Sequence, residues 1–191
     1  MDDRIKVYKN QLAEVKRAIK IDICGYLKDC NYNTTSDTFV KIELESLADL
    51  SKVPSGAGFY IILTNKIFAD NKCTFTLLTT TAIYRGHCCN VKNRIMSHLF
   101  TTHFKKNVRT KKHFTNYTVC LKIEDGVNGI DIDSKEYSKY NWTVLVHKMN
   151  GSSALMRQQA ELAFDELFKK PIKSREKLTI QKKPYLIKNE K

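Results

Sequence analysis

Apolar residues recur at alternating steps of three and four positions near the N-terminus, with charged side chains between them. The apolar positions are Ile5, Tyr8, Leu12, Val15 and Ile19. This spacing lines one side of an α-helix, so it predicts an amphipathic helix over residues 3–23. Such a stripe covers the core of its own domain more often than it pairs with another subunit, and both outcomes stay open here. Gly25 and the polar run 31–37 end the pattern.

The middle of the chain holds short apolar runs that are typical of strands. Residues 59–63 are apolar and partly β-branched, and they predict a buried strand after a turn at 54–58. A short element is expected near residues 40–50. Further strands are predicted over residues 75–78, 81–85, 117–123 and 142–146, with a turn around Asp70 and Asn71.

Capping residues and apolar spacing indicate two further helices. Asn90 can cap a helix that runs to about residue 104, with Val91, Ile95 and Leu99 as its apolar stripe. Ser152 or Ser153 can cap another that runs to about residue 169, before Pro171. Its inward-facing residues are expected to be Ala160, Phe164, Leu167 and Phe168.

These elements predict an α/β fold of the α+β kind, in which helices flank a small, mainly antiparallel sheet of three to five strands. We expect an N-terminal helical segment over residues 1–50 that packs on the core or extends it. The core domain is expected over residues 51–171, with an insertion around 105–141. A basic tail follows over residues 172–191.

The chain is strongly basic, with 33 Lys and Arg against 20 Asp and Glu and a net charge of +13. Such an excess favours a nucleic acid as partner, because a basic surface gains free energy by releasing counterions from phosphates. A plain solvated surface is the alternative. An anionic membrane is less favoured, because no basic amphipathic helix with bulky apolar anchors stands out.

Cysteine spacing and the spread of charge narrow the class of protein further. The six cysteines form no C-x-x-C pair, so free thiols are expected rather than a zinc site. No stretch approaches the roughly 18 apolar residues of a membrane span. The charged first 30 residues do not resemble a signal peptide. We therefore expect a cytoplasmic protein without a membrane partner or an organic cofactor.

The most informative stretch runs from Gly58 to Leu99. It contains Gly58-Phe59-Tyr60, then Tyr84-Arg85-Gly86, then Arg94 and His98. In this order, with ten residues from Tyr84 to Arg94, the stretch resembles the GIY-YIG nuclease superfamily. There a first strand carries Gly-x-Tyr, a second carries Tyr-x-Gly, and the next helix carries an Arg, followed four residues later by His or Tyr in several branches. A later helix presents a metal-binding Glu, and Glu161 is the best match.

The chain also departs from that pattern. Phe59 stands where Ile is common, and Arg85 occupies the middle of the second motif. The connection between the two tyrosines is longer than usual, which implies an inserted hairpin or loop. The family often has an Asn after the Glu helix, whereas here Lys173 or Ser174 falls near its place. The resemblance covers residues 50–100 and 140–170, a little under half of the chain.

The resemblance implies a catalytic set of Tyr60, Tyr84, Arg94, His98 and Glu161. Arg94 would offer phosphate oxygens a planar, permanent charge, and His98, one helical turn on, would relay a proton or hold the phosphate. Glu161 would bind one Mg²⁺, for which Mn²⁺ would substitute, to neutralise charge on the leaving 3′ oxygen. Tyr60 or Tyr84 would position or deprotonate the attacking water, and a phenolate would need cationic neighbours.

Each of these residues also has an ordinary structural explanation. The tyrosines could be strand residues with satisfied hydroxyls, and Arg94 and His98 could lie on a solvated helix face. Asp165 and Glu166 are close rivals of Glu161. Candidate DNA contacts, chosen for charge near the motifs and in the basic run before His113, are Arg85, His87, Lys92, Lys105, Lys106, Arg109, Lys111 and Lys112.

The expected activity is Mg²⁺-dependent endonucleolytic cleavage of double-stranded DNA that leaves 5′-phosphate and 3′-hydroxyl ends. A compact domain with arms favours a type II restriction-like or defence enzyme, which cuts as a homodimer or by paired encounters. A phage, mobile-element or repair nuclease of the same fold stays open. So do a non-catalytic nucleic-acid-binding module and an interaction domain that dimerises through its N-terminal helix.

Overall fold

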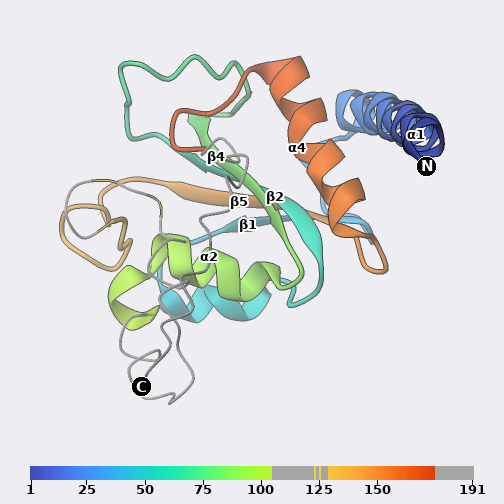
Figure 1. Ribbon diagram of the computed structural model, residues 1–191. Helices are drawn as coiled ribbons and strands as arrows, with labels where there is room; N and C mark the ends of the chain where they lie inside the picture. Colours follow the sequence, from blue (N-terminus) through green and yellow to red (C-terminus); the bar gives the residue numbers. More distant parts are fainter. Residues whose placement is uncertain (105–122, 124, 126–128, 175–191) are drawn as a thin grey trace, which may run out of the picture.

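The computed structural model describes residues 1–104, 123, 125 and 129–174. Its centre is a curled, five-stranded antiparallel sheet with the strand order β1-β5-β2-β4-β3 (Figure 1). The strands are β1 (Phe39–Glu43), β2 (Gly58–Thr64), β3 (Thr76–Leu77), β4 (Thr80–Cys88) and β5 (Trp142–Lys148). The α+β class and the mainly antiparallel sheet predicted from the sequence are confirmed.

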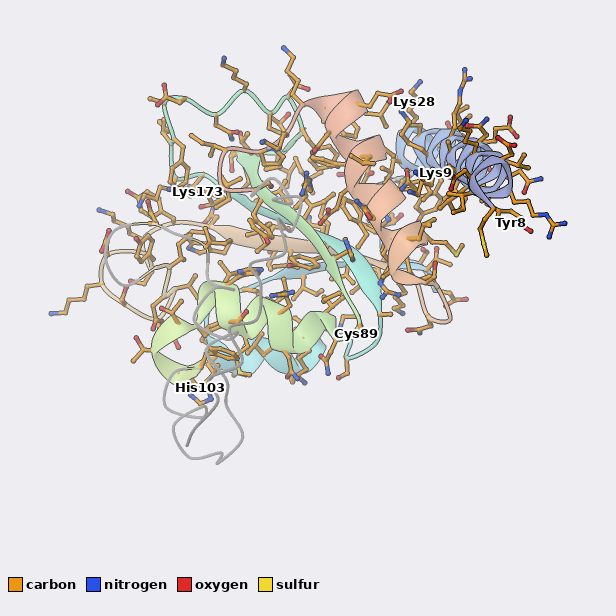
Figure 2. All side chains as sticks on the ribbon, in the orientation of Figure 1. Tyr8, Lys9, Lys28, Cys89, His103 and Lys173 are labelled. Atoms are coloured by element: carbon orange, nitrogen blue, oxygen red, sulfur yellow. The ribbon has the colours of Figure 1, made fainter. Side chains whose placement is uncertain are left out.

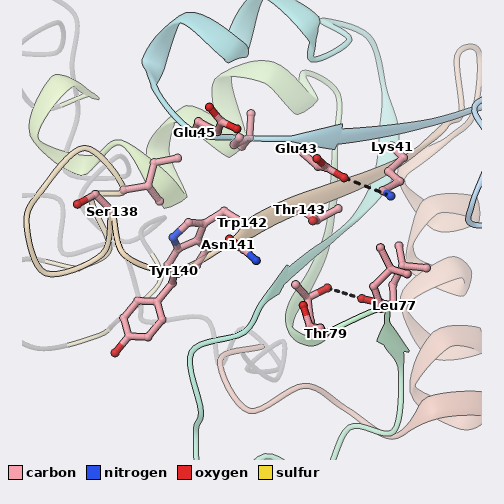
Figure 3. A pocket seen from close by; sticks show the side chains of 14 residues that line it. Lys41, Glu43, Glu45, Leu77, Thr79, Ser138, Tyr140, Asn141, Trp142 and Thr143 are labelled. Atoms are coloured by element: carbon pink, nitrogen blue, oxygen red, sulfur yellow. Dashed lines mark hydrogen bonds and ion pairs between the residues drawn. The ribbon is translucent and has the colours of Figure 1, made fainter.

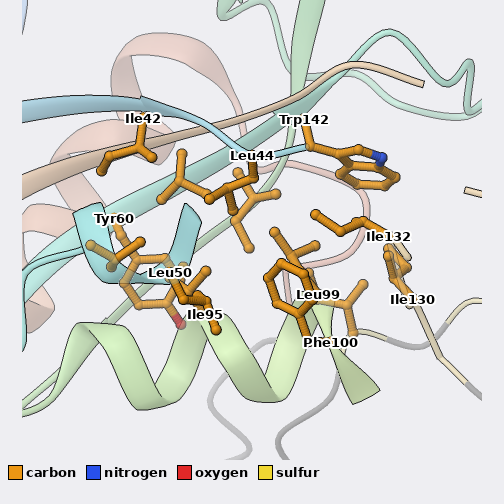
Figure 4. Close-up of a cluster of buried hydrophobic side chains, with 14 of the residues drawn as sticks. Ile42, Leu44, Leu50, Tyr60, Ile95, Leu99, Phe100, Ile130, Ile132 and Trp142 are labelled. Carbon is orange, nitrogen blue, oxygen red and sulfur yellow. The ribbon is translucent and has the colours of Figure 1, made fainter. Parts of the chain in front are cut away.

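Helices cover both faces of the sheet (Figure 1). They are α1 (Asp2–Asp29), α2 (Val91–Leu99) and α4 (Ala154–Phe168), together with the 3-10 helix η1 (Leu47–Lys52). The α2-side core joins α2 and η1 to one face of the sheet, and Tyr60 and Ile95 lie in it (Figure 4). The α4-side core joins α4 and the end of α1 to the other face, around Phe59 and Phe164. Because β2 is buried along its whole length, its alternating side chains supply both cores.

The sequence located most elements but not all of their ends. β2, β5 and α4 lie where a strand, a strand and a helix were predicted. α1 continues to Asp29, six residues past the predicted end at residue 23. α2 ends at Leu99, where Phe100 leaves helical geometry and forms a bridge to Asp131, and residues 101–104 are helical again up to the predicted end. The predicted basic loop 105–113 lies outside the described residues, as does all of the predicted strand 117–123 except Ile123.

The first 50 residues are more than the helical segment predicted for them. They also supply the edge strand β1, which pairs with β5.

Among the residues that the structure describes, no helix is long and apolar enough to cross a membrane. The cysteines among the described residues are free thiols, as expected: Cys24, Cys30, Cys73, Cys88 and Cys89.

The last described residues pack against β4. The backbone N–H of Lys173 donates to the carbonyl of Ile83, and that of Arg85 donates to Ser174 Oγ over 2.9 Å. The Lys173 ammonium also donates to the carboxylate of Asp125 over 3.0 Å. The segment predicted as a basic tail therefore begins as part of the packed domain.

His147 is a buried polar group on the α4 side of β5. Its ring lies 5.0 Å from that of Phe39 and 5.7 Å from that of Phe59. Nδ1 is hydrogen-bonded to Tyr26 Oη over 3.1 Å, whereas Nε2 is buried without a partner. Burial in these aromatic surroundings lowers the pKa of His147 from 6.5 to about 3, since desolvation penalises the charged form.

This pKa predicts that acid destabilises the fold through His147. The folded imidazole stays neutral while the unfolded one takes up a proton below pH 6.5, so the free energy of unfolding falls as the pH drops from there toward 3. The contribution approaches about 1.4 kcal/mol per pH unit. Urea unfolding of His147→Phe from pH 7 to 4 should show a shallower dependence than the wild type.

Tyr26→Phe is the matched control for this experiment. It removes the hydrogen bond to His147 but leaves the imidazole able to titrate. We expect it to lower stability at every pH by about 1 kcal/mol while keeping the wild-type pH dependence. Equal slopes for His147→Phe and the wild type would contradict the assignment of acid sensitivity to this residue.

Candidate functional site

The hydroxyl of Tyr60 is hydrogen-bonded to Nε2 of His98 over 2.9 Å. Tyr60 comes from the central strand β2 and His98 from α2, and both side chains are buried, at 1% exposure each. The start of α2 is fixed by Asn90, whose side chain accepts from the backbone N–H of Asn93. The first two backbone N–H groups of α2 donate to carbonyl groups in the turn before β2. Strand and helix are therefore held together where the two motifs meet.

Tyr84 joins this pair from the neighbouring strand β4. Its ring lies 4.5 Å from that of His98 and 6.1 Å from that of Tyr60. The β2–β4 ladder shifts register between Ile62 and Leu63, leaving Ile83 as the extra residue on β4. A bulge of this kind reverses the alternation of side chains beyond it. It places Tyr84 on the α2 side with Tyr60, although Ala82 belongs to the α4-side core.

Gly86 lets Tyr60 approach β4 closely. The two residues face each other across the ladder, and a Cβ on Gly86 would lie 2.6 Å from Tyr60 Oη and 2.9 Å from Tyr84 Cε1. These distances leave no room for a methyl group. The glycine of the second motif is therefore required by the packing of both tyrosines.

Burial and the charge of Arg94 act on the tyrosine hydroxyls in opposite directions. Burial is the largest effect and raises the pKa of both Tyr60 and Tyr84. The half-buried Arg94 guanidinium partly offsets this rise at both hydroxyls. The two phenols therefore stay protonated at neutral pH and act as hydrogen-bonding groups rather than as phenolates.

A second cluster, made of charged side chains, lies on the opposite face of β4. Arg85 follows Tyr84 in the strand, so its side chain points toward α4. Its Nε and Nη2 donate to the carboxylate of Asp165 over 3.0 and 2.5 Å. Its Nη1 lies 3.5 Å from Glu161 Oε2, and His87 Nε2 lies 4.0 Å from the same oxygen. Glu161 is thus a buried acid paired with Arg85, not an exposed acid of the helix surface.

The five predicted catalytic residues divide between these two faces. Tyr60, Tyr84 and His98 are in contact on the α2 side, and Arg94 acts on the tyrosines by its charge. Glu161 belongs to the α4 side, yet its charge contributes to the raised pKa of Tyr84. The two groups lie on opposite faces of β4. The outer edge of β4, on the side away from β2, is paired among the described strands only with β3, at Thr80 and Thr81.

The predicted DNA contacts lie in three different surroundings. Arg85 is buried at 7% exposure and bound to two carboxylates, which favours a role inside the domain over a phosphate contact. His87 is half-buried beside Glu161, and Lys92 is half-buried at the start of α2. The remaining candidates, Lys105, Lys106, Arg109, Lys111 and Lys112, lie outside the described residues.

Two contributions to the site were not recognised from the sequence. Asp165 was weighed only as a rival metal ligand, whereas it binds Arg85 in a bidentate pair. Ser174 was noted near the place of a missing Asn, and it accepts the backbone N–H of Arg85. Both contacts join residues at least 80 positions apart, and no local pattern signals such a pairing.

Glu161 fits a magnesium ion only as a single protein ligand. Within the described ranges, no group of three or more His, Cys, Asp or Glu side chains could hold a metal. Mg²⁺ keeps several of its waters and accepts sites with one or two carboxylates, so this donor set is compatible with it. The guanidinium of Arg85 beside Glu161 would compete with the ion for the carboxylate.

A hollow of about 430 Å³ opens away from this site, between the two edge strands of the curled sheet (Figure 3). Its walls include Lys41 and Leu77, from β1 and β3, and Trp142 from β5. Lys41 is already paired with Glu43 over 3.3 Å. None of the predicted catalytic residues lines the hollow, so it is separate from the tyrosine and histidine cluster.

Comparison with known proteins identifies no relative. No protein-family profile, no curated protein and no solved structure matches the chain significantly.

The close contact at Gly86 predicts a large cost for adding one methyl group. Gly86→Ala should lower the free energy of unfolding by about 1–3 kcal/mol, because the new Cβ would force Tyr60 or Tyr84 from its position. Gly25→Ala is the matched control, since a Cβ there meets nothing within 4 Å. Inside α1, one turn before its last residue, this change should stabilise by up to about 1 kcal/mol. Denaturant unfolding that shows equal effects for both would contradict the packing argument.

Proposed function

We propose that this protein is a metal-dependent endonuclease that hydrolyses phosphodiester bonds in DNA, with a catalytic domain similar to the GIY-YIG superfamily. The observation that supports this most strongly is the contact of Tyr60, Tyr84 and His98, with the charge of Arg94 acting on both hydroxyls. These groups come from the three segments whose order carries the sequence resemblance. An unrelated fold would have little reason to bring those segments together.

The degree of burial separates the roles of the two tyrosines. Tyr60 is buried and bonded to His98, so we assign both residues to positioning the site from beneath. Tyr84 is half-buried, and its protonated hydroxyl can orient a water molecule beside the phosphate. Hydrolysis forms a bond from that water to phosphorus and breaks the bond to the 3′ oxygen, which leaves as a hydroxyl. Arg94 stabilises the charge that develops on the phosphate oxygens.

Glu161 is the residue that would hold Mg²⁺, or Mn²⁺ in its place. A bound divalent ion would supply positive charge for the leaving oxygen. Arg85 and Asp165 position Glu161: Asp165 binds two nitrogens of Arg85, and the third guanidinium nitrogen faces Glu161. The substrate would approach along the outer edge of β4, beside Tyr84 and Glu161. The charge of Glu161 raises the pKa of Tyr84, so the two side chains are close enough to interact.

Double-stranded DNA is the proposed substrate because the net charge of +13 favours a polyanion. By resemblance, the products would carry 5′-phosphate and 3′-hydroxyl ends. We favour a type II restriction-like or defence enzyme, with a phage, mobile-element or repair nuclease as the alternative of the same fold. These roles are distinguished by whether cleavage of long DNA gives discrete fragments or a smear.

A non-catalytic nucleic-acid-binding module is the second candidate. It is favoured by one observation: Glu161 is paired with Arg85 and lies on the face opposite to Tyr60 and His98. In such a module this ion pair would only stabilise the fold. DNA binding without Mg²⁺-dependent cleavage, across supercoiled, linear and single-stranded substrates, would favour this function.

Cleavage of supercoiled plasmid tests the enzyme directly. With Mg²⁺ the wild type should nick or linearise the plasmid, and chelator should stop it. Arg94→Ala should lower the rate by about 100-fold or more, because it removes the positive charge that stabilises the transition state. Arg17→Ala, which removes an exposed charge of α1, should cleave like the wild type. Equal rates for the two variants would exclude Arg94 from the site.

Two substitutions on α4 separate metal binding from support. Glu161→Gln should abolish cleavage but keep DNA binding, since it removes the only proposed protein ligand. Asp165→Asn should mainly lower stability, by about 1–3 kcal/mol, because it weakens the buried pair with Arg85. Cleavage, gel-shift binding and urea unfolding should be measured for both. If Asp165→Asn abolishes cleavage at wild-type stability and Glu161→Gln does not, Asp165 is the ligand.

A further inference from the structure

The N-terminal half of α1 carries an apolar stripe that nothing in the described chain covers. Ile5, Tyr8, Leu12 and Val15 are 44–64% exposed, and Tyr8 lies on the side of α1 away from α4 (Figure 2). The helix packs on the domain only farther along. There Lys20 bonds Glu166 over 2.5 Å, Cys24 contacts the Ala163 carbonyl, and Leu27 is buried.

The projecting half of α1 gains little stability from the domain itself. Residues 1–15 are all exposed, and isolated helices shorter than about 12–15 residues are marginal in water. Most helical stability in proteins comes from packing an apolar face. The expectation that this stripe covers the core of its own domain is therefore wrong from Ile5 to Val15, which stay uncovered, and only Ile19 at its end is half-buried. Tertiary contacts among the described residues do not explain why the first half is helical.

The spacing of the stripe is that of a coiled coil. Met1, Ile5, Tyr8, Leu12, Val15 and Ile19 follow one another at steps of four and three, which is the alternation of a and d positions in a heptad repeat. The uncovered stripe extends about 28 Å along the axis at 1.5 Å per residue. It ends near Ile19, which is half-buried, where α4 begins to cover α1.

We propose that the occupant of this stripe is the stripe of a second copy of the chain, bound antiparallel in a two-helix coiled coil. In this register, Ile5 packs against Val15 of the partner subunit and Tyr8 against Leu12 of the partner subunit. Met1 meets Ile19 of the partner subunit, and the two-fold axis repeats each layer. The pairing therefore buries every apolar position of the uncovered half and leaves the two domains at opposite ends.

Charge favours the antiparallel over the parallel orientation. In the antiparallel register, Asp2 lies beside Lys16 of the partner subunit on both sides of the axis, and the only close like-charge pair is Lys9 with the partner's Lys9. In a parallel dimer, Arg4 would lie beside Lys9 of the partner subunit on both sides, which is repulsive twice. Flanking charges of this kind set the orientation of coiled coils.

Sedimentation of the full chain over a range of concentrations tests the dimer. The wild type should be a dimer at micromolar concentrations. Leu12→Glu should raise the dissociation constant by about 100-fold or more, because it places a charge in a central layer. Val7→Glu is the matched control: Val7 is 52% exposed but lies outside the stripe, so the dimer should persist. A wild type that stays monomeric to 100 µM, or a Leu12→Glu variant that dimerises normally, would overturn the proposal.

A charge exchange tests the antiparallel register. Asp2→Lys alone and Lys16→Glu alone should each weaken the dimer several-fold, and the double variant should restore it. In a parallel dimer, positions 2 and 16 are far apart, so the double variant would not recover. Loss of restoration would overturn the register. Thermal unfolding of each variant checks that the domain itself is unchanged, because these residues lie outside both cores.

Discussion

The close approach of Tyr60 to β4 is the contact on which the rest of the site depends. β2 is buried on both faces, so Tyr60, a polar side chain on its α2 side, must satisfy its hydroxyl inside the protein. His98 does so, and this requires α2 to lie across the strand in a fixed register. Gly86 makes the approach possible because it leaves no side chain between the strands. One buried hydroxyl thus determines the placing of a strand, a helix and a glycine.

Strand β4 contributes side chains to two different clusters, because neighbouring side chains in a strand point to opposite faces of the sheet. Tyr84 meets the aromatic and histidine groups beneath α2, while Arg85 meets the carboxylates of α4. The bulge at Ile83 sets which residue faces which side. Without it, Tyr84 would point with Ala82 into the α4-side core, and Arg85 would point toward α2. The bulge is therefore as important to the candidate site as any of its named side chains.

Sequence periodicity was sufficient for the parts of the fold that rest on local order. The apolar run of β2 and the capped, striped helices α2 and α4 could be predicted because their burial repeats at a fixed spacing. The bulge at Ile83 leaves no such repeat, so the division of the five candidate residues between two faces could not be foreseen. The contacts of Arg85 with Asp165 and Ser174 join residues at least 80 positions apart. The uncovered half of α1 has the same spacing as a core helix, which is why core packing was expected.

The charges around Arg85 explain how a buried arginine and the proposed metal ligand could occupy one cluster. One guanidinium faces two carboxylates, so the ion group carries a formal excess of one negative charge. The two bonds to Asp165, at 3.0 and 2.5 Å, are shorter than the 3.5 Å contact with Glu161. Asp165 therefore satisfies most of the charge of Arg85, and Glu161 is the acid less strongly bound. A cation that arrives at the edge of β4 would meet the carboxylate that costs less to redirect, which is why Glu161 and not Asp165 is assigned to the metal.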